Sequence, residues 1–309
     1  MGTVFGTDYV VANVSTMHGG AQKVVYKIDC TNHFSCVLYV WDLSMNFFLE
    51  EIASASIADQ SYGGHLFEMN NRFLREHGIQ TPALYNLNTE RSRYQFDYAL
   101  VEYVNGHKAE QYFQHSDTKV QDQLFERIGD MLTCMHANER QSYGKPSQVG
   151  EHLGSCHLLQ LENAQEQLSY AVNHIESIRV NQSRLLEKLH ELESRIEPRN
   201  RYGFIHGELG PDHILVTDQL EPYLIDIEGA GFYDIEHEHS FLELRFRDFY
   251  RYLKKDTLDH NRMLFYQFHH HIALTSGGLK LLHRGFPDQS FAKGLADYQC
   301  RRTLQFIEG

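Results

Sequence analysis

The chain has 309 residues, of which 42% are hydrophobic, as in a globular protein with one or two domains. Its formal net charge of −13, with lysines and arginines not gathered into runs, disfavours a nucleic-acid binder. That charge would attract a cationic substrate, although a need for solubility explains it equally well. The five cysteines are scattered and form no CxxC pair, so neither a disulfide framework nor a cysteine zinc site is expected.

The sequence shows no basic region followed by an apolar run at its start, and no stretch approaches the roughly 18 apolar residues of a membrane span. Together with the cysteine pattern, this predicts a cytoplasmic protein that contacts no membrane. We expect small molecules as its partners and leave the oligomeric state open.

Two short β-strands are predicted early in the chain. β-Branched and aromatic residues run over 24–28 and over 37–41, with a turn-prone segment between them, which indicates a hairpin. A tight turn with Gly19 and Gly20 precedes the first strand. Such a turn brings backbone N–H groups close to phosphate oxygens, or it is an ordinary hairpin turn.

Helical spacing follows. Apolar residues on one face predict a helix over 64–77, which Gly78 ends. A strand is expected over 98–104, and the apolar stripe over 124–135 predicts a further helix.

The third quarter of the chain differs in character. Leucines and isoleucines at helical spacing mark two amphipathic helices, which we interpret as an inserted helical hairpin over about 156–197. Short strands return at 214–216 and 223–225, and the segment from residue 236 onward is aromatic-rich and helical. These patterns predict an α+β protein, β-rich in its first part and mainly helical in its larger second part.

The most informative stretch runs from His206 to Glu228. One apolar strand leads into a loop that gathers His206, Glu208 and His213 around glycines and a proline, and a second ends in Asp226 and Glu228. Carboxylates at strand ends are well placed to hold a metal ion. Phosphoryl transfer needs such an arrangement, because Mg²⁺ neutralises the phosphate charge while one further carboxylate orients the acceptor hydroxyl.

This stretch resembles the catalytic and metal loops of the aminoglycoside phosphotransferase and choline kinase family, whose pattern is HGDxxxxN followed by a short metal loop of the form Dx[DE]. The resemblance implies a two-lobed, protein-kinase-like fold. It places a nucleotide-binding lobe at 1–104 and a catalytic and substrate lobe at 105–309.

The same resemblance implies roles for the loop residues. Glu208 holds the position of the catalytic carboxylate, where the family has the shorter Asp. His213 replaces a metal-binding Asn, and an imidazole suits Zn²⁺ or Mn²⁺ better than Mg²⁺. Asp226 matches the principal Mg²⁺ ligand, and Glu228 the second acid of the metal loop. His206 matches a loop histidine with a structural role.

Weaker matches extend the resemblance to the nucleotide site. The turn at Gly19 and Gly20 is similar to the family's phosphate-covering turn. The segment from Glu102 to Val104 is similar to the linker whose backbone binds adenine. Both are expected to bind the nucleotide.

Glu68 matches a helix glutamate that normally pairs with a lysine of the third strand, and it is therefore a further candidate for the nucleotide site. That lysine is missing here, because Tyr39 holds its position. Lys23 or Lys27 would then have to reach the phosphates, or no lysine does.

Acidic residues that follow the metal loop are candidates for substrate binding. In similar kinases this region lines the acceptor pocket, and the candidates are Asp234, Glu236 and Glu238. A solvated acidic helix is an equal alternative. The histidine tract at 269–271 points in several directions on a helix, so we interpret it as packing rather than as a metal site.

The resemblance implies an ATP- or GTP-dependent kinase with Mg²⁺ or Mn²⁺, acting on a hydroxyl of a small molecule such as an aminoglycoside-like antibiotic or an amine-bearing metabolite. The departures at Tyr39, Glu208 and His213 keep a second hypothesis open, a catalytically inactive relative that binds a nucleotide or small ligand as a sensor or scaffold. A metal-dependent hydrolase built on the loop histidines and carboxylates is a third, which leaves the two lobes unexplained.

Overall fold

The computed structural model describes residues 1–17, 20–54, 61–150 and 155–308. Their contacts divide the chain into two compact units. Unit 1 consists of Met1–Ala137, Lys145–Gln148 and Gly210–Gly231, and unit 2 of Asn138–Gly144, Val149–Leu209 and Phe232–Gly309. The lobe boundary at residue 104 stays a prediction.

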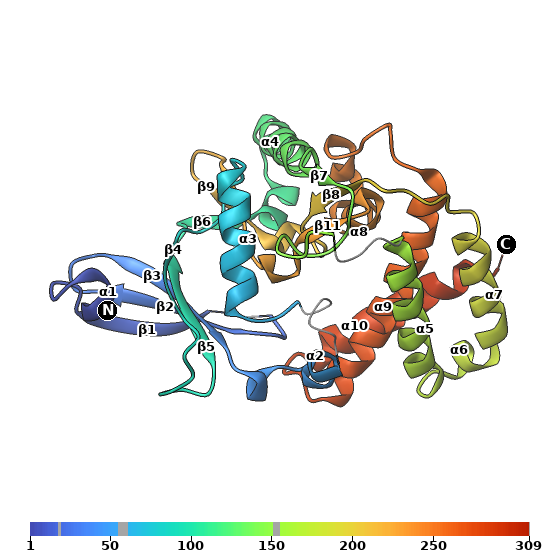
Figure 1. The fold of residues 1–309 in the computed structure, drawn as a ribbon, viewed down its shortest axis with the longest axis horizontal. Helices are drawn as coiled ribbons and strands as arrows, with labels where there is room; N and C mark the ends of the chain where they lie inside the picture. Colours follow the sequence, from blue (N-terminus) through green and yellow to red (C-terminus); the bar gives the residue numbers. More distant parts are fainter. Residues whose placement is uncertain (18–19, 55–60, 151–154, 309) are drawn as a thin grey trace. The chain divides into compact units, whose positions relative to one another are not determined.

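A five-stranded antiparallel sheet forms the first part of unit 1, with strand order β1-β2-β3-β5-β4 (Figure 1). The strands are β1 Val11–Met17, β2 Val24–Cys30, β3 Ser35–Trp41, β4 Leu84–Asn88 and β5 Asp97–Glu102. The expected hairpin is β2 and β3, where Val25 lies opposite Tyr39. Three short helices also belong to unit 1: α1 Gly2–Phe5, η1 Leu43–Met45 and α2 Leu49–Ser54.

Helix α3, Gly64–Glu76, packs on this sheet through a buried apolar face. The ring of Phe67 lies 5.4 Å from that of Tyr39 and 5.7 Å from that of Trp41, measured between centroids. The helix ends as expected, because Gly78 adopts a positive φ of 77° that suits glycine. The sheet and α3 thus share one core.

The rest of unit 1 carries the predicted metal loop, residues 226–228. Its elements are β6 Gly106–Lys108, η2 Ala109–Gln114, α4 Thr118–His136, η3 Pro211–His213, β9 Ile214–Thr217, β10 Pro222–Leu224 and η4 Ile227–Gly229. β10, β9 and β6 form a small sheet in that order. The backbones of β6 and β9 approach so closely at Gly106 that a Cβ there would lie 2.3 Å from the Val216 carbonyl oxygen.

Unit 2 is mainly helical. Its helices are α5 His157–Val172, α6 Glu176–Val180, α7 Gln182–Glu193, α8 Ile235–Phe246, η5 Arg247–Tyr252, α9 His260–His283 and α10 Gln289–Gln305. Helices α5, α7, α8 and α10 all pack on the long α9 (Figure 1). A small three-stranded sheet has the strand order β11-β8-β7, with β11 Gly231–Tyr233, β8 Tyr202–Ile205 and β7 Glu139–Arg140.

The predicted helical hairpin consists of α5 and α7 with the short α6 between them. Buried leucines and isoleucines of these helices join aromatic residues of α9 in one core, including Leu168, Leu185, Leu189, Phe265 and Phe268. The α+β class expected from the sequence is confirmed. None of the helices in the described part of the chain is long and apolar enough to cross a bilayer.

Candidate active site

The metal loop lies at one end of the β9–β10 hairpin in unit 1. The Ile225 N–H donates to the His213 carbonyl oxygen at 3.0 Å, so the hairpin brings the two predicted metal ligands together. His213 Nε2 lies 3.5 Å from Asp226 Oδ2. Asp226 adopts a left-handed conformation with φ 64°, which Asp tolerates better than most residues.

Lys23, which immediately precedes β2, reaches both carboxylates of this loop. Its Nζ lies 2.6 Å from Asp226 Oδ1 and 2.5 Å from Glu228 Oε1. The lysine side chain is only 8% exposed, so the ammonium is almost entirely withdrawn from solvent. Of the two lysines that the sequence offered as substitutes for the missing one, Lys23 is therefore placed at the metal loop. Lys27 instead pairs with Asp29.

Aromatic residues of β3 enclose the ammonium. Lys23 Nζ lies 4.8 Å from the centroid of the Tyr39 ring, a cation–π distance. The indole N–H of Trp41 donates to Glu228 Oε1 at 2.9 Å. Tyr39, at the position where the resemblance expects a lysine, thus forms part of the wall around Lys23, which lies just before β2.

The charges of this cluster stabilise one another. Burial alone favours a neutral amine, but Asp226 and Glu228 raise the pKa of Lys23 above its ordinary value. Burial likewise raises the pKa of Tyr39 to about 12, so the phenol stays neutral. The result is a positive charge fixed between two carboxylates at neutral pH.

Two buried side chains fix the backbone of η4. Asn70 of α3 donates to the carbonyl oxygen of Ile227 at 2.7 Å, and Lys145 Nζ donates to that of Gly229 at 2.9 Å. Sequence reasoning missed both. Asn70 interrupts the apolar face of α3, and a polar residue within a buried helical face was the signal available.

Glu208 lies in unit 2, exposed in the loop after β8. The carboxylate of Glu238, on α8, accepts from the backbone N–H of His206 at 2.7 Å and from that of Gly207 at 3.1 Å. His206 itself is buried. A buried carboxylate therefore holds the backbone directly before Glu208.

The other two acidic substrate candidates also have partners within unit 2. Asp234 accepts from the guanidinium of Arg262 and from the hydroxyl of Tyr266. Glu236 forms a two-pronged ion pair with Arg199, at 2.8 and 3.1 Å. Asp234, Glu236 and Glu238 are all buried, and these partners support a packing role for them.

The remaining nucleotide candidates lie in unit 1. Glu68 is partly exposed, and its carboxylate lies 3.5 Å from Arg72 on the same helix. Glu102 at the end of β5 accepts from the Ala83 N–H at 3.0 Å, and Val104 is buried.

The turn expected to cover the phosphates is described only in part. Gly20 is exposed, and a Cβ there would meet nothing within 4 Å. Gly19 lies outside the described residues. The Phe47 N–H donates to the Ala21 carbonyl oxygen and the Asn46 amide to that of Gln22, which fixes the segment leading to Lys23.

Comparison with known proteins identifies the fold. The fold is similar to that of a thermostable mutant of aminoglycoside phosphotransferase APH(4)-Ia, with a TM-score of 0.61, 15% identity and coverage of 94% of this chain and 95% of that one. It is also similar to the choline kinase LicA of Streptococcus pneumoniae, with a TM-score of 0.62, 14% identity and coverage of 98% and 96%. A third similar structure is that of a protein of Ralstonia eutropha assigned to the aminoglycoside phosphotransferases. Its TM-score is 0.68 and its sequence identity 13%, with coverage of 99% of this chain and 94% of that one.

These similarities confirm the kinase-like fold expected from the sequence. A search of the curated proteins found no match. The model of the phosphotransferase enzyme family matches residues 66–242, more than half of the chain. The chain therefore belongs to the phosphotransferase enzyme family.

Proposed function

We propose that the protein transfers the terminal phosphoryl group of ATP or GTP to a hydroxyl group of a small molecule. The observation that carries the proposal is the cluster of Lys23, Asp226 and Glu228, which combines a fixed cation with metal-binding carboxylates. Solved structures with this fold include APH(4)-Ia mutants in ternary complexes with ADP or AMP-PNP and hygromycin B, and LicA with AMP.

The residues of the metal loop fit a hard divalent cation. The side chain of Asp226 is 42% exposed, so it can accept a metal and its waters, whereas the Glu228 side chain is only 7% exposed and already accepts from Lys23 and Trp41. Asp226 would be the principal ligand of Mg²⁺, or of Mn²⁺, with His213 beside it and Glu228 behind it. The bound ion would neutralise the phosphate charge.

Lys23 would take the electrostatic role of the missing third-strand lysine. Val25 of β2 lies directly opposite Tyr39 of β3, so a lysine placed two residues before Val25 reaches the same loop from the neighbouring strand. Gly19, Gly20, Glu68, Glu102 and Val104 stay our candidates for the nucleotide site.

Glu208 would orient the acceptor hydroxyl and receive its proton. Asp234, Glu236 and Glu238 are buried and paired, so they give no reason to prefer acceptors that carry amines. An acceptor screen should therefore include small molecules with a hydroxyl group whether or not they carry an amine. Aminoglycosides and amine-bearing metabolites remain in that screen. We propose a cytoplasmic enzyme, with nucleotide and acceptor as its partners and 1–104 and 105–309 as its lobes.

The second candidate function is nucleotide binding without transfer. Two departures favour it. Glu208 is one methylene longer than the family's aspartate, and a displacement of about 1 Å can cost about a hundredfold in rate. His213 replaces an oxygen ligand by an imidazole. A sensor or scaffold would retain Lys23 and Asp226 and dispense with Glu208.

A turnover assay separates the two functions. The purified protein is incubated with ATP or GTP, with Mg²⁺ or Mn²⁺, and with a panel of aminoglycosides, choline-like alcohols and sugars. The release of ADP or GDP is measured. Mass spectrometry identifies the product, which should be about 80 Da heavier than its acceptor because one phosphoryl group has been added.

Glu208→Gln is expected to abolish acceptor-dependent turnover while nucleotide binding persists, and Glu208→Asp to retain turnover. Glu187→Gln, on the exposed face of α7, is the matched control. Nucleotide binding without turnover on any acceptor would favour the sensor, and equal turnover in Glu208→Gln and wild type would remove Glu208 from the mechanism.

A further inference from the structure

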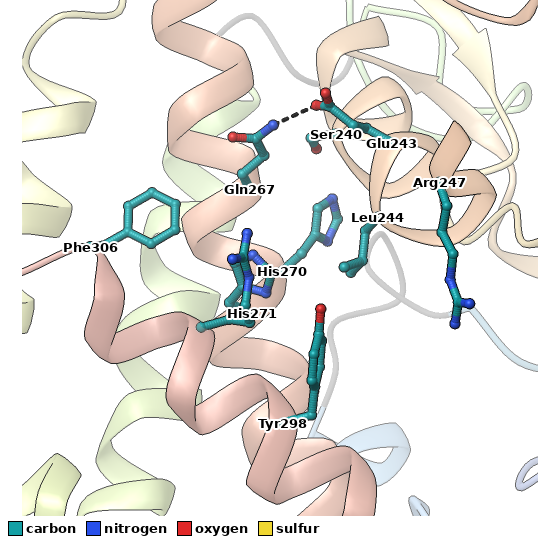
Figure 2. Close-up of a pocket in the computed structure, with 10 residues that line it drawn as sticks. Ser240, Glu243, Leu244, Arg247, Gln267, His270, His271, Tyr298 and Phe306 are labelled. Atoms are coloured by element: carbon teal, nitrogen blue, oxygen red, sulfur yellow. Dashed lines mark hydrogen bonds between the residues drawn. The ribbon is translucent and has the colours of Figure 1, made fainter. Parts of the chain in front are cut away.

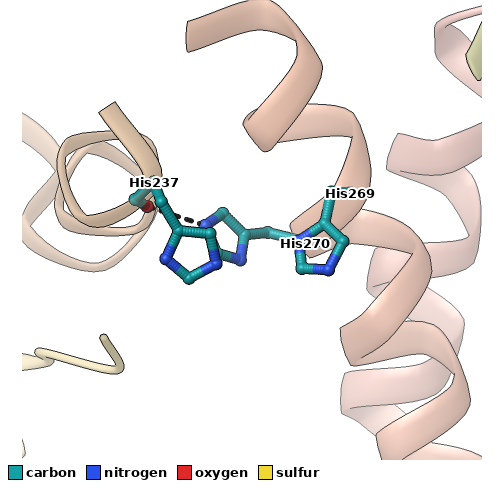
Figure 3. A group of neighbouring side chains, drawn as sticks. All are labelled: His237, His269 and His270. Atoms are coloured by element: carbon teal, nitrogen blue, oxygen red, sulfur yellow. Dashed lines mark hydrogen bonds between the residues drawn. The ribbon is translucent and has the colours of Figure 1, made fainter. Parts of the chain in front are cut away.

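Three histidines from two helices of unit 2 meet side by side (Figure 3). His237 comes from α8, and His269 and His270 from α9. Ring centroids are separated by 5.7 Å for His237 and His269, 4.6 Å for His237 and His270, and 5.2 Å for His269 and His270. One nitrogen from each ring lies within 4.8 Å of the others.

Two of these rings form hydrogen bonds through Nε2. His269 Nε2 lies 3.0 Å from the side-chain oxygen of Asn163, and His270 Nε2 lies 2.9 Å from the His237 carbonyl oxygen. Both partners are acceptors, so each Nε2 carries the proton and each Nδ1 has its lone pair available. Nδ1 of His237 and Nδ1 of His269 are buried and have no hydrogen-bond partner.

An unpaired buried nitrogen is unfavourable, and two in one cluster require an explanation. The bonds made by Nε2 are those that metal-binding histidines use to fix the tautomer and the ring orientation. Burial lowers the pKa of His237 and His269 well below the ordinary histidine value, so these rings are neutral at pH 7. Neutral imidazole is the form that binds a metal.

We propose that His237, His269 and His270 bind a divalent transition-metal ion of the Zn²⁺ type. Three imidazoles suit Zn²⁺, Ni²⁺, Co²⁺ or Cu²⁺ and disfavour Mg²⁺, which requires oxygen ligands. Three protein ligands leave a fourth position for water or an added ligand.

The rings would close slightly around the ion. Tetrahedral bonds of 2.0–2.1 Å place ligand nitrogens about 3.3 Å apart, so the widest separation would shorten by about 1.5 Å. Rotation about χ2 of a histidine is soft, and the hydrogen bonds of Nε2 hold two of the rings on the correct side.

A cavity of about 350 Å³ beside the cluster supplies an approach for the ion and room for the fourth ligand (Figure 2). His270 belongs to both the cluster and the cavity wall. The same wall contains Glu243, Gln267, Arg247 and Arg302. Glu243 accepts from the Gln267 amide at 2.6 Å, so the carboxylate is held in place.

This site is independent of the proposed phosphoryl transfer. Its residues all belong to unit 2, whereas His213, Asp226 and Glu228 belong to unit 1. Its ligands are nitrogens rather than oxygens. It would join α8 to α9 and stabilise the helices that follow the metal loop.

The test is metal binding to the full chain after removal of metal with a chelator. Zn²⁺ is titrated by calorimetry in the presence of millimolar Mg²⁺, which occupies oxygen sites, and Co²⁺ is used as a spectroscopic probe of tetrahedral nitrogen ligation. We expect one tight Zn²⁺ per chain, visible d–d bands with Co²⁺, and a saturable rise in Tm with Zn²⁺.

Variants distinguish this site from the other histidines of the chain. His237→Gln is expected to weaken Zn²⁺ binding at least about a hundredfold, and Asn163→Ala, which removes the hydrogen bond to His269, about 10- to 100-fold. His271→Gln is the matched control, because His271 is the next buried histidine of α9 but bonds Gln299. Asp226→Asn identifies any Zn²⁺ that binds beside His213, so the binding that persists in this variant belongs to the site in unit 2.

His237→Cys guards against misfolding, because a thiolate is itself a zinc ligand and should preserve binding. Zn²⁺ binding that is equally strong in wild type and in a folded His237→Gln variant would overturn the proposal. So would the absence of a saturable site in wild type.

Discussion

Removal of the buried positive charge of Lys23 is the most informative perturbation of the metal loop. Lys23→Met keeps most of the apolar stem and deletes the ammonium that lies 2.6 Å from Asp226 and 2.5 Å from Glu228. Breaking a buried ion pair from one side costs about 3–5 kcal/mol, mainly because the remaining charge is left buried and unpaired.

The lower end of that range applies here. The side chain of Glu228 is 7% exposed but keeps the hydrogen bond from Trp41, and that of Asp226 is 42% exposed, so water screens it. We expect the free energy of unfolding to fall by about 3 kcal/mol. Nucleotide affinity should fall as well, because the two carboxylates would then repel the phosphates.

Urea denaturation followed by circular dichroism measures the stability change, and calorimetry with ATP and Mg²⁺ measures the affinity. Lys27→Met, on the adjoining strand β2, is the matched control, since Lys27 forms a partly exposed pair with Asp29 and a cation–π contact with Tyr103 and contacts neither carboxylate of the loop through these interactions. A Lys23→Met variant as stable as wild type, with unchanged nucleotide affinity, would refute the assigned role of the lysine.

Three further predictions concern the fold and its response to pH. Asn70→Ala removes the side-chain hydrogen bond to the Ile227 carbonyl oxygen of η4 and should lower the free energy of unfolding by about 1 kcal/mol, with a loss of metal-dependent nucleotide binding in calorimetry. Gly106→Ala should destabilise by about 1–3 kcal/mol in urea because its Cβ would strike a backbone oxygen of β9, whereas Gly294→Ala in the open face of α10 should be neutral or stabilising. The metal-free protein should lose about 2 kcal/mol between pH 7 and pH 5 through His270, whose pKa burial lowers to about 4. Stability falls on acidification because the unfolded chain, with a histidine pKa near 6.5, binds more protons below that pH than the folded chain does. A series of urea denaturations in which the free energy of unfolding does not fall between pH 7 and pH 5 would contradict this prediction.

Local pattern was sufficient for most of the fold. The strand pair β2 and β3, helix α3 with its glycine end, and the β9–β10 hairpin all carry spacing or turn signals that act within a few residues. The insertion was predicted as two helices, and the short α6 between them was missed because five residues carry too little periodicity.

The partners of the site residues required the fold. The pairing of Lys23 with Asp226 and Glu228 joins segments about two hundred residues apart, and sequence alone could offer Lys23 only as one of two candidates. Asp234 is buried because it pairs with Arg262, and no local sequence pattern predicts that pairing.

The histidine tract at 269–271 shows the same limit. Consecutive residues on a helix do point in different directions, as expected, but the rings of His269 and His270 both come close to a third ring that α8 supplies. A metal site assembled from two helices therefore has no fixed spacing along the chain. Only the packing of α8 on α9 reveals it.

The central claim is that Asp226 and Lys23 form a metal-dependent nucleotide site, and calorimetric titration of ATP and GTP with and without Mg²⁺ tests it most directly. We predict binding to the wild type that requires Mg²⁺ and weakens at least about tenfold in Asp226→Asn, since one principal ligand is lost. Binding that is indifferent both to Mg²⁺ and to Asp226→Asn, or no binding of either nucleotide, would contradict the claim.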